Sequence, residues 1–256
     1  MEFLRDTWIL FLRLVRATMR MPVFIILSIA QPILWVAMFG ALFRSVVQIP
    51  GFGATSYVQF LAPGVAIMTA LFGAAHSGMG MLVDIERGVL DRLLATPAAR
   101  GSIIAARLLN SGVQVFLQAG LIIGVAMLLG AKAKGGLLGI LLVMLSASLL
   151  GAAVAAFSNA VALLARRQET VIAVMNFVIL PATFTSTMLM SANLMPVWVQ
   201  RAANVNPVNW AIVAARDGFE GGAPHELATR LALLAAFALV CGLFATGSFG
   251  RYRRAM

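Results

Sequence analysis

The amino-acid sequence predicts an all-α integral membrane protein with six transmembrane helices, preceded by an amphipathic helix at the membrane interface. Of the 256 residues, 61% are hydrophobic and only 11% are charged, and the mean hydropathy is +0.96. Soluble domains are about 45–50% apolar and about 25% charged, and one soluble core of this length could not bury so much apolar surface. The apolar residues also fall into stretches long enough to cross a bilayer.

Residues 1–21 are expected to form an amphipathic helix that lies in the membrane interface. At the helical period the charged residues from Glu2 to Arg20 gather on one side, and apolar residues such as Trp8 and Phe11 cover the other. This pattern is typical of a helix bound to a membrane surface. Pro22 then ends the helix. A simple membrane anchor and an elbow beside a cytoplasmic partner both remain open.

Six stretches reach the length of about 20 residues that a transmembrane helix needs. None of them has a charge at its centre. The connections show no pattern of a soluble domain, so residues 1–256 are expected to form one membrane domain. The predicted spans are Pro22–Phe43, Tyr57–Leu82, Arg107–Leu129, Leu137–Leu164, Val171–Ser191 and Ala228–Phe249.

The distribution of basic residues predicts the orientation. Cytoplasmic loops are enriched in Lys and Arg, and most of the arginines fall on one side if the N-terminus is inside. Both termini are therefore expected in the cytoplasm, in the cytoplasmic (inner) membrane of a bacterium. The net charge of +10 is attributed to this orientation and to contact with anionic membrane lipid, and no nucleic acid partner is expected.

The sequence contains no motif for nucleotide hydrolysis or other catalysis. The phosphate-binding loop, the His-Glu-x-x-His zinc motif and the Gly-x-Ser-x-Gly nucleophile motif are all missing. The one cysteine, Cys241, excludes an intrachain disulfide and a Cys-based metal site. We expect no catalytic residue, metal or cofactor in this chain. The spans also lack the central ionisable groups of ion-coupled transporters, so energy for transport should come from another subunit.

The cytoplasmic loop over residues 83–104 is predicted to contain a short helix. Leu90, Leu93 and Leu94 give it an apolar side, and charged residues occupy the rest. Pro97 should end the helix near Thr96, because the residue before proline disfavours the helical conformation. A solvated helix and a helix whose apolar ridge inserts into a groove of a soluble partner both fit this pattern.

The residue pattern of this loop resembles that of a known protein family. The pattern Glu86-x-Gly88-x-Leu90-x-x-Leu93-Leu94-x-Thr96-Pro97 is similar to that of type-2 ABC export permeases (the ABC-2 family), in particular daunorubicin-resistance-like membrane subunits. A second similarity covers Leu194-Met-Pro-Val-Trp198 and Asn206-Pro-Val-Asn-Trp210, followed by Arg216; Trp210 stands where the family has tyrosine. The span order extends the resemblance over essentially the whole chain.

The resemblance implies a division of roles along the chain. Residues 1–21 would be the connecting helix, and residues 192–227 would contain short re-entrant or outer-face helices, although an ordinary outer loop stays open. Two copies of a separate ATP-binding subunit would bind ATP and Mg. A second copy of this permease would complete a homodimer with the pathway at its interface. The residues that would couple to the ATPase subunit are Glu86, Gly88, Leu90, Leu93, Leu94, Thr96 and Pro97.

Candidate residues of the translocation path are polar or adaptable side chains within the spans. The amides of the third span recur every four residues and share one helical face, and they should face other helices or a cavity because unsatisfied amides are costly in hydrocarbon. Met and Phe form adaptable apolar walls. Packing between helices explains the same residues, and His76 is expected to be a buried imidazole. The candidates are Gln31, Asn110, Gln114, Gln118, Asn176, Phe177, Phe184 and Met188.

The expected function is that of the membrane-spanning permease subunit of an ATP-driven ABC exporter. Its cargo would be a hydrophobic or amphipathic compound, such as a drug, a lipid or a lipid-linked glycan. A non-transporting membrane scaffold or assembly subunit with the same fold is the alternative. An intramembrane enzyme is disfavoured by the missing catalytic residues.

Overall fold

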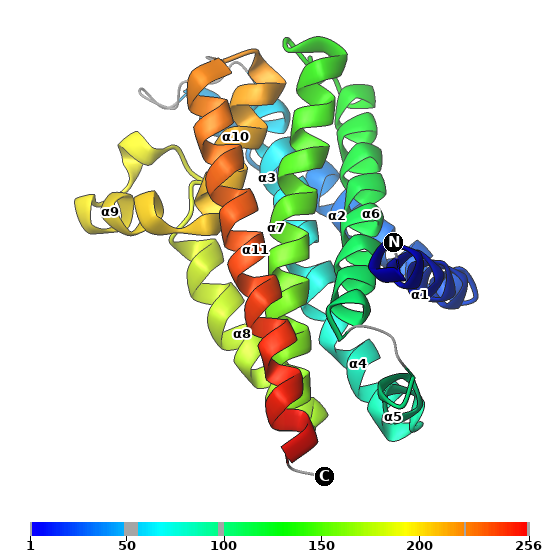
Figure 1. Cartoon of the computed structure of the whole chain (residues 1–256). Coiled ribbons are helices and arrows are strands. Elements are labelled where there is room, and N and C mark those ends of the chain that lie inside the picture. The colour runs from blue at the N-terminus through cyan, green and yellow to red at the C-terminus, as the bar shows by residue number, and fades with distance from the viewer. Residues whose placement is uncertain (1, 49–55, 97–99, 223, 255–256) are drawn as a thin grey trace.

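The computed structural model describes residues 2–48, 56–96, 100–222 and 224–254, and in these ranges the regular elements are helices (Figure 1). Two of them are the 3-10 helices η1 (Arg44–Gln48) and η2 (Ala192–Leu194). The α-helices are α1 (Glu2–Met19), α2 (Pro22–Leu42), α3 (Tyr57–Ala75), α4 (Ser77–Glu86), α5 (Val89–Leu94), α6 (Arg100–Leu128), α7 (Gly136–Ala165), α8 (Gln168–Phe184), α9 (Val197–Val205), α10 (Pro207–Glu220) and α11 (Pro224–Arg254).

Four helical segments of the described chain are long and apolar enough to cross a membrane: Tyr57–Glu86, Gly101–Leu128, Gly136–Ala165 and His225–Gly250. Shorter apolar helices over Ile26–Leu42 and Gln168–Phe184 occupy the first and fifth predicted spans. The all-helical, multi-pass class is therefore confirmed. The count of six crossings, the interfacial position of α1 and the single-domain organisation stay predictions.

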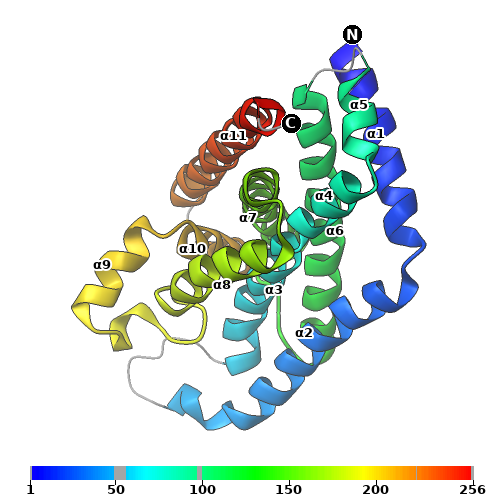
Figure 2. The ribbon, with the colours of Figure 1, turned by 90° about the horizontal axis from the view of Figure 1, so that it is seen from below.

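Helix α7 lies at the centre of the bundle, with α3, α6, α8, α10 and α11 around it (Figure 2). Small residues let these neighbours approach closely. A Cβ added to Gly151 of α7 would lie 2.9 Å from Val115 Cγ2 of α6. Ser148 Oγ of α7 donates a hydrogen bond to the Gly112 carbonyl of α6 at 3.1 Å. Close backbone approach thus holds the α6–α7 pair together.

Three predicted span boundaries differ from the structure. The second span is broken at His76, between α3 and α4. The third helix begins at Arg100, well before Arg107, because Arg107 has an acidic partner inside the bundle and need not mark a helix end. The fifth helix ends at Phe184 and not at Ser191. The apolar composition continues past Phe184, but the backbone after it bonds to another helix, as described below.

Most of the described residues between 192 and 227 lie in helices, namely η2, α9, α10 and the start of α11, and do not form an ordinary loop. Pro196 precedes α9 and Pro207 is the first residue of α10, positions where proline's missing N–H costs nothing. In Figure 1, α8 occupies the lower part of the molecule and α10 the upper part. Helix α9 leaves sideways between their facing ends (Figure 1). Helices α8 and α10 together therefore extend over about the same height of the bundle as the single helix α7 or α11.

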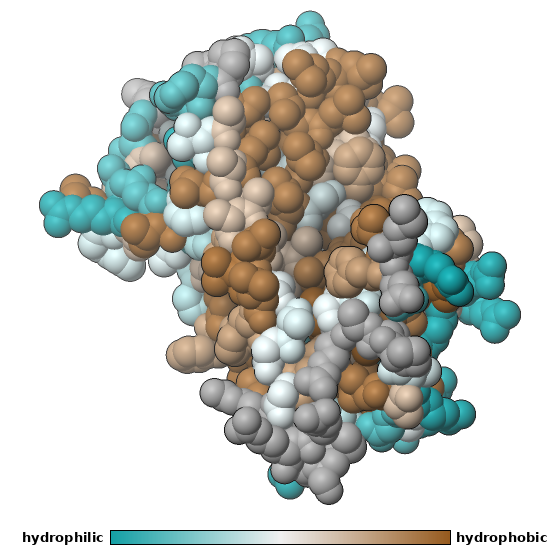
Figure 3. Space-filling model, viewed as in Figure 1, coloured by the Kyte–Doolittle hydropathy of each residue, from teal (hydrophilic) through white to brown (hydrophobic). Residues whose placement is uncertain are grey.

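The surface separates into apolar and hydrophilic regions. In Figure 3, hydrophobic residues cover much of the face over α6, α7 and α11, whereas hydrophilic residues collect on the projecting α9 and around α1 and α5. Leu117 of α6 and Leu239 of α11 are 60% and 65% exposed. Such large exposed apolar side chains are expected where helices face lipid, since lipid tails are as apolar as leucine.

Candidate functional site

The predicted coupling segment forms α5, a six-residue helix beside the end of α4. Gly88 precedes it with a φ of 63°, in the left-handed region that favours glycine. Thr96 Oγ1 donates a hydrogen bond to the Leu93 carbonyl at 2.6 Å just after the helix. Pro97 lies outside the described residues. The glycine turn thus sets the direction in which α5 leaves α4.

The two sides of α5 face opposite ways. Leu90 is fully buried, and Leu93 and Leu94 pack partly buried against the core of this chain. The bundle of this chain therefore covers the apolar ridge fully at Leu90 and in part at Leu93 and Leu94. Glu86 and Arg92, in contrast, are exposed. The surface that α5 offers is charged, and the leucines hold the helix in place.

Truncating the buried leucine tests this arrangement. Leu90→Ala is expected to lower the free energy of unfolding by about 2–5 kcal/mol, the usual cost of emptying a buried leucine site. Thermal unfolding of the purified protein in detergent measures the change. Val83→Ala on α4 is the control, since Val83 is 40% exposed. Equal melting temperatures for the two variants would show that Leu90 does not anchor α5.

Asp84 joins three helices next to α5. Its Oδ1 accepts a hydrogen bond from Arg13 Nη2 of α1 at 2.8 Å, and its Oδ2 accepts one from Arg107 Nη2 of α6. Arg107 is buried, and it also donates to the Gly80 carbonyl at 3.4 Å. A buried guanidinium needs such a carboxylate. Asp84 was not among the site residues predicted from the sequence. A signal was available, because Asp84 is an acid near the end of a predicted span and arginines occur in two other predicted helices.

Tyr252 ties the last helix to α5. Its hydroxyl donates a hydrogen bond to Asp91 Oδ1 at 3.0 Å. The Arg166 guanidinium lies 4.4 Å from the Tyr252 ring centroid, and its Nη2 donates to the Tyr252 carbonyl at 2.6 Å. Burial, and then the hydrogen bond to Asp91, raise the pKa of the Tyr252 hydroxyl, so it remains a donor at neutral pH. The coupling segment is thus held from the α1 side and from the α11 side.

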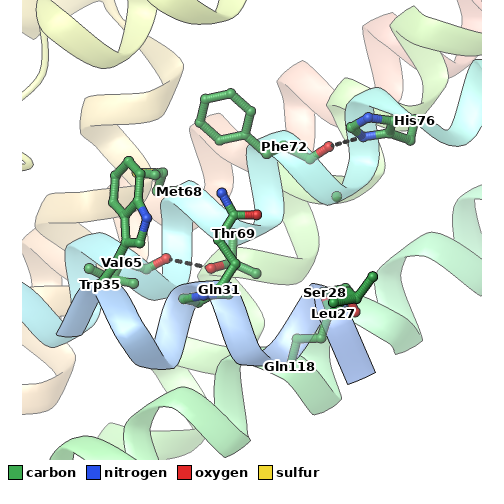
Figure 4. Close-up of a pocket in the computed structure, with 12 residues that line it drawn as sticks. Leu27, Ser28, Gln31, Trp35, Val65, Met68, Thr69, Phe72, His76 and Gln118 are labelled. Carbon is green, nitrogen blue, oxygen red and sulfur yellow. Dashed lines mark hydrogen bonds between the residues drawn. The ribbon is translucent and has the colours of Figure 1, made fainter. Parts of the chain in front are cut away.

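A cavity of about 580 Å³ lies between α2, α3 and α6 (Figure 4). Its walls include Trp35 together with the amides of Gln31 and Gln118. Gln118 Nε2 donates to Ser28 Oγ at 3.0 Å. His76 lies at one end and is exposed, contrary to the expected buried imidazole, with Nδ1 2.7 Å from the Phe72 carbonyl. This volume is within the range of about 300–1,000 Å³ usual for small-molecule sites.

The other amides of the third span lie along the same helix as Gln118. Gln114 Nε2 donates to Thr18 Oγ1 of α1 at 3.2 Å, and Asn110 is half-buried. Gln114 therefore bonds to α1 and Gln118 to α2, which links α6 to both neighbours. Of the amides predicted in the path, only Gln31 and Gln118 line the cavity.

The candidates of the fifth span lie elsewhere. Asn176, Phe177 and Phe184 are exposed on α8, the two rings at 81% and 72%. Met188 lies beyond the end of α8 and is buried, where a Cβ on Gly64 of α3 would come within 3.3 Å of its Cγ. One copy of the chain therefore does not gather the eight candidate path residues into a single site.

Two asparagines join the facing ends of α8 and α10. Asn206 Nδ2 donates to the Ala182 carbonyl at 2.6 Å and to Thr185 Oγ1 at 3.1 Å, while its Oδ1 accepts the Val208 N–H at 2.9 Å. Asn209 Oδ1 accepts from both the N–H and the hydroxyl of Thr187, at 3.0 and 2.7 Å. We call this cluster the Asn206 joint. It gives partners to irregular backbone that lipid could not satisfy.

Arg216 fixes the same backbone from the other side. Its Nη2 donates to the Thr187 carbonyl at 3.1 Å and to the Phe60 carbonyl of α3 at 3.4 Å. The guanidinium carbon lies 3.8 Å from the centroid of the Phe60 ring, a distance at which a cation is attracted to an aromatic face. The Asn-Pro-Val-Asn-Trp…Arg pattern thus joins α3, α8 and α10.

A bundle of long apolar helices that encloses a cavity fits a multi-pass membrane protein. Residues 5–219 match the family model of the ABC-2 type transporter. The chain therefore belongs to the ABC-2 type transporter family, and the family expected from the loop and Asn-Pro patterns is confirmed.

Named relatives agree with this family. The chain is 31% identical over 215 residues to the transport permease ycf38 of Cyanophora paradoxa, covering 84% of this chain and 74% of the relative. It is 28% identical over 211 residues to the daunorubicin resistance ABC transporter permease protein DrrB1 of Streptomyces coeruleorubidus, with 82% and 74% covered. A Mycobacterium tuberculosis permease named for doxorubicin resistance, DrrC, is 30% identical over 195 residues, with 76% and 70% covered. The relatives are transport permease subunits, which fits a membrane subunit that is not itself an enzyme.

Proposed function

We propose that this chain is the export permease of an ATP-driven ABC transporter, and that it moves a hydrophobic or amphipathic compound outward across the cytoplasmic membrane of a bacterium. The observation that carries the proposal is the position of α5. It presents charged side chains outward, while the buried Leu90 and the Asp91–Tyr252 bond hold it to the bundle and to α11. Asp84 holds the adjoining α4 to α1 and α6. A helix fixed in this way can transmit a displacement caused by a bound partner to the rest of the bundle.

The partner at α5 is an ATP-binding subunit, one for each permease copy. Glu86, Arg87 and Arg92 are exposed charges at this helix, and Arg92 also donates hydrogen bonds to the Gly88 and Arg87 carbonyls. Exposed charges across an interface set partner choice and register. ATP and Mg belong to that subunit. The N- and C-termini lie on the same, cytoplasmic side, which agrees with the bonds that join α1 to α4 and Tyr252 to α5.

A second copy of the chain covers the side on which α8 and α9 lie. Asn176 on α8 and Arg201 on α9 are exposed, and α9 projects sideways well below the top of the bundle (Figure 1). A charged or amide side chain in contact with hydrocarbon is costly. Pairing two copies, with a water-accessible pathway between them, removes these groups from lipid. The exposed rings Phe177 and Phe184 then become walls of the interface.

The cavity indicates the chemistry of the cargo. Its lining contains Trp35, Met68 and Phe72 for apolar contact, and Gln31 and Gln118 for hydrogen bonds. No Asp, Glu, Lys or Arg lines it among the described residues. A mainly apolar wall with a few orienting polar groups is usual for small-molecule sites. An amphipathic compound with aromatic surface fits best, and the relatives named for daunorubicin and doxorubicin resistance support that class.

ATP acts by changing which conformation the permease prefers. A partner shifts that preference only if it binds the two conformations of the permease with different affinity. Closure of nucleotide-loaded subunits would displace α5 with its bonded neighbours and alternate access to the pathway between the two sides of the membrane. The alternating step therefore depends on α5 remaining attached to the bundle.

The test is ATPase activity of the purified complex. The chain should copurify with the ATP-binding subunit encoded beside it, and aromatic amphipathic compounds should stimulate its ATP hydrolysis in vesicles, with export measured in parallel. The isolated permease should hydrolyse no ATP. A complex that assembles but shows neither stimulation nor export across a broad compound panel would instead indicate a non-transporting scaffold.

Filling the cavity should block cargo and spare assembly. Gly73 lines the cavity, and a Cβ there would lie 3.6 Å from Gln118 Oε1. Gly73→Leu is expected to reduce export about tenfold, which corresponds to about 1.4 kcal/mol of lost cargo binding. Helix propensity favours leucine over glycine, so the helix should not be weakened.

The control is Gly124→Leu on α6, since Gly124 is exposed with open space around a new Cβ. Export assays in inside-out vesicles compare the two variants. Equal export would place the cargo outside this cavity.

A further inference from the structure

The second apolar stretch is broken at His76, and no proline lies at the break. Helix α3 ends at Ala75 and α4 starts at Ser77. The Met79 N–H bonds to the His76 carbonyl at 3.0 Å, one residue short of the α-helical pattern. The Ala75 carbonyl and the Gly78 N–H therefore both need partners outside the helix.

Ser158 of α7 supplies both partners. Its hydroxyl accepts the Gly78 N–H at 3.0 Å and donates to the Ala75 carbonyl at 2.5 Å. Ser158 is fully buried. We call residues Ala75–Gly78 with Ser158 the His76 joint. One buried hydroxyl on the central helix thus satisfies both ends of the break.

The joint is also a point of close backbone contact. A Cβ on Gly78 would lie 2.5 Å from the Ser158 carbonyl oxygen and 2.9 Å from its carbonyl carbon, so glycine is needed for the approach. The next residue, Asn159, donates to Ser77 Oγ at 2.9 Å. Its buried Oδ1 has no hydrogen-bond partner among the described residues. The close backbone approach and the Ser158 hydroxyl therefore fix the point at which the start of α4 contacts α7, and Asn159 Oδ1 lies beside this point as an acceptor without a partner among the described residues.

The His76 joint lies between the docking helix and the cavity. On one side, α4 carries Asp84 and leads directly to α5. On the other side, His76 and Gly73 line the cavity, and Figure 4 shows His76 at its end. His76 belongs both to the joint and to the cavity wall, so a change in the angle between α4 and α3 at the joint would move His76 at the end of the cavity.

We propose that Ser158 and Gly78 are positioning residues for transport: the His76 joint is the pivot through which the nucleotide state of the partner, received at α5, reaches the cavity. The inference rests on the proposed function, because it needs an ATP-binding subunit at α5. It adds the place at which a displacement of α5 becomes a change in the cavity. Neither residue lines the cavity, and both are buried.

Thiol labelling in the cavity tests the pivot. A Met68→Cys thiol, in a Cys241→Ala background, reports access to the cavity in the complex with the ATP-binding subunit. Labelling rates by a small maleimide are compared without nucleotide and with ATP plus vanadate. Nucleotide should change the rate at least about fivefold with the native joint, and less than about twofold with Gly78→Ala or Ser158→Ala.

Matched controls separate a pivot from general damage. Gly80→Ala makes the same change two residues away, where a Cβ would lie 3.4 Å from Arg107 Nη1. Ser146→Ala removes another buried hydroxyl of α7, one that bonds within its own helix to Leu142. Both controls should keep the nucleotide response, and all four variants should retain the ATP-binding subunit.

Each of the other outcomes would contradict either the inference or the proposed function. If Gly78→Ala and Ser158→Ala respond to nucleotide as the controls do, the joint is not a pivot. If both variants lose the partner or fail to fold while the controls do not, the joint is only structural and the inference fails. If the native complex does not assemble, or shows no nucleotide response, the proposed function fails together with it.

Discussion

Asp84→Asn is expected to destabilise the protein by about 3–5 kcal/mol, the usual cost of removing one partner from a buried ion pair. The reason is Arg107, whose side chain is only 6% exposed, whereas Arg13, the other partner, is 41% exposed. Solvent can replace the carboxylate for Arg13 but not for Arg107. The loss should also release α1 from α4, so export should fall with stability.

Thermal unfolding of the purified variant measures the effect of Asp84→Asn. Glu169→Gln is the control, since it neutralises an exposed acid at the start of α8. The double variant Asp84→Asn/Arg107→Met should recover part of the loss, because it removes the buried charge as well as its partner. An Asp84→Asn protein as stable as the Glu169→Gln control would contradict the three-helix role of Asp84.

Local composition was sufficient to predict most of the helices. Helix α7 (Gly136–Ala165) matches the predicted span Leu137–Leu164 closely, because hydropathy along one segment decides whether that segment enters a bilayer. The short helix α5 (Val89–Leu94) was predicted for the same reason, since the leucine spacing is a local feature. These signals need no knowledge of neighbouring helices.

The sequence could not show features that depend on contacts between distant segments. The break at His76 requires Ser158, which lies far along the chain on α7. The early end of α8 requires Asn206 and Asn209 of a later helix. The inward direction of the α5 leucines depends on the packed core, not on their spacing. Polar residues inside apolar stretches were the visible clue, but their partners become known only from the fold.

The Asn206 joint should be as important for stability as the Asp84 bridge. Asn206→Ala is expected to lower the free energy of unfolding by about 2–4 kcal/mol. Loss of a helix N-cap costs about 0.5–2 kcal/mol, and a buried group left without a partner costs about 1–3 kcal/mol. Here the cap on Val208 and the partner of the Ala182 carbonyl disappear together.

The measurement is chemical unfolding of the purified protein in mixed micelles, followed by the export assay. Asn204→Ala is the matched control, because it truncates an exposed amide two residues earlier and keeps the carbonyl that accepts the Trp210 Nε1 hydrogen bond. Asn206→Asp should be less harmful than Asn206→Ala for the α10 cap, but it cannot donate to the Ala182 carbonyl when ionised. Asn204→Ala should therefore be more stable than either Asn206 variant. If all three unfold alike, the facing ends of α8 and α10 are held by packing alone, and the asparagine bonds contribute nothing measurable.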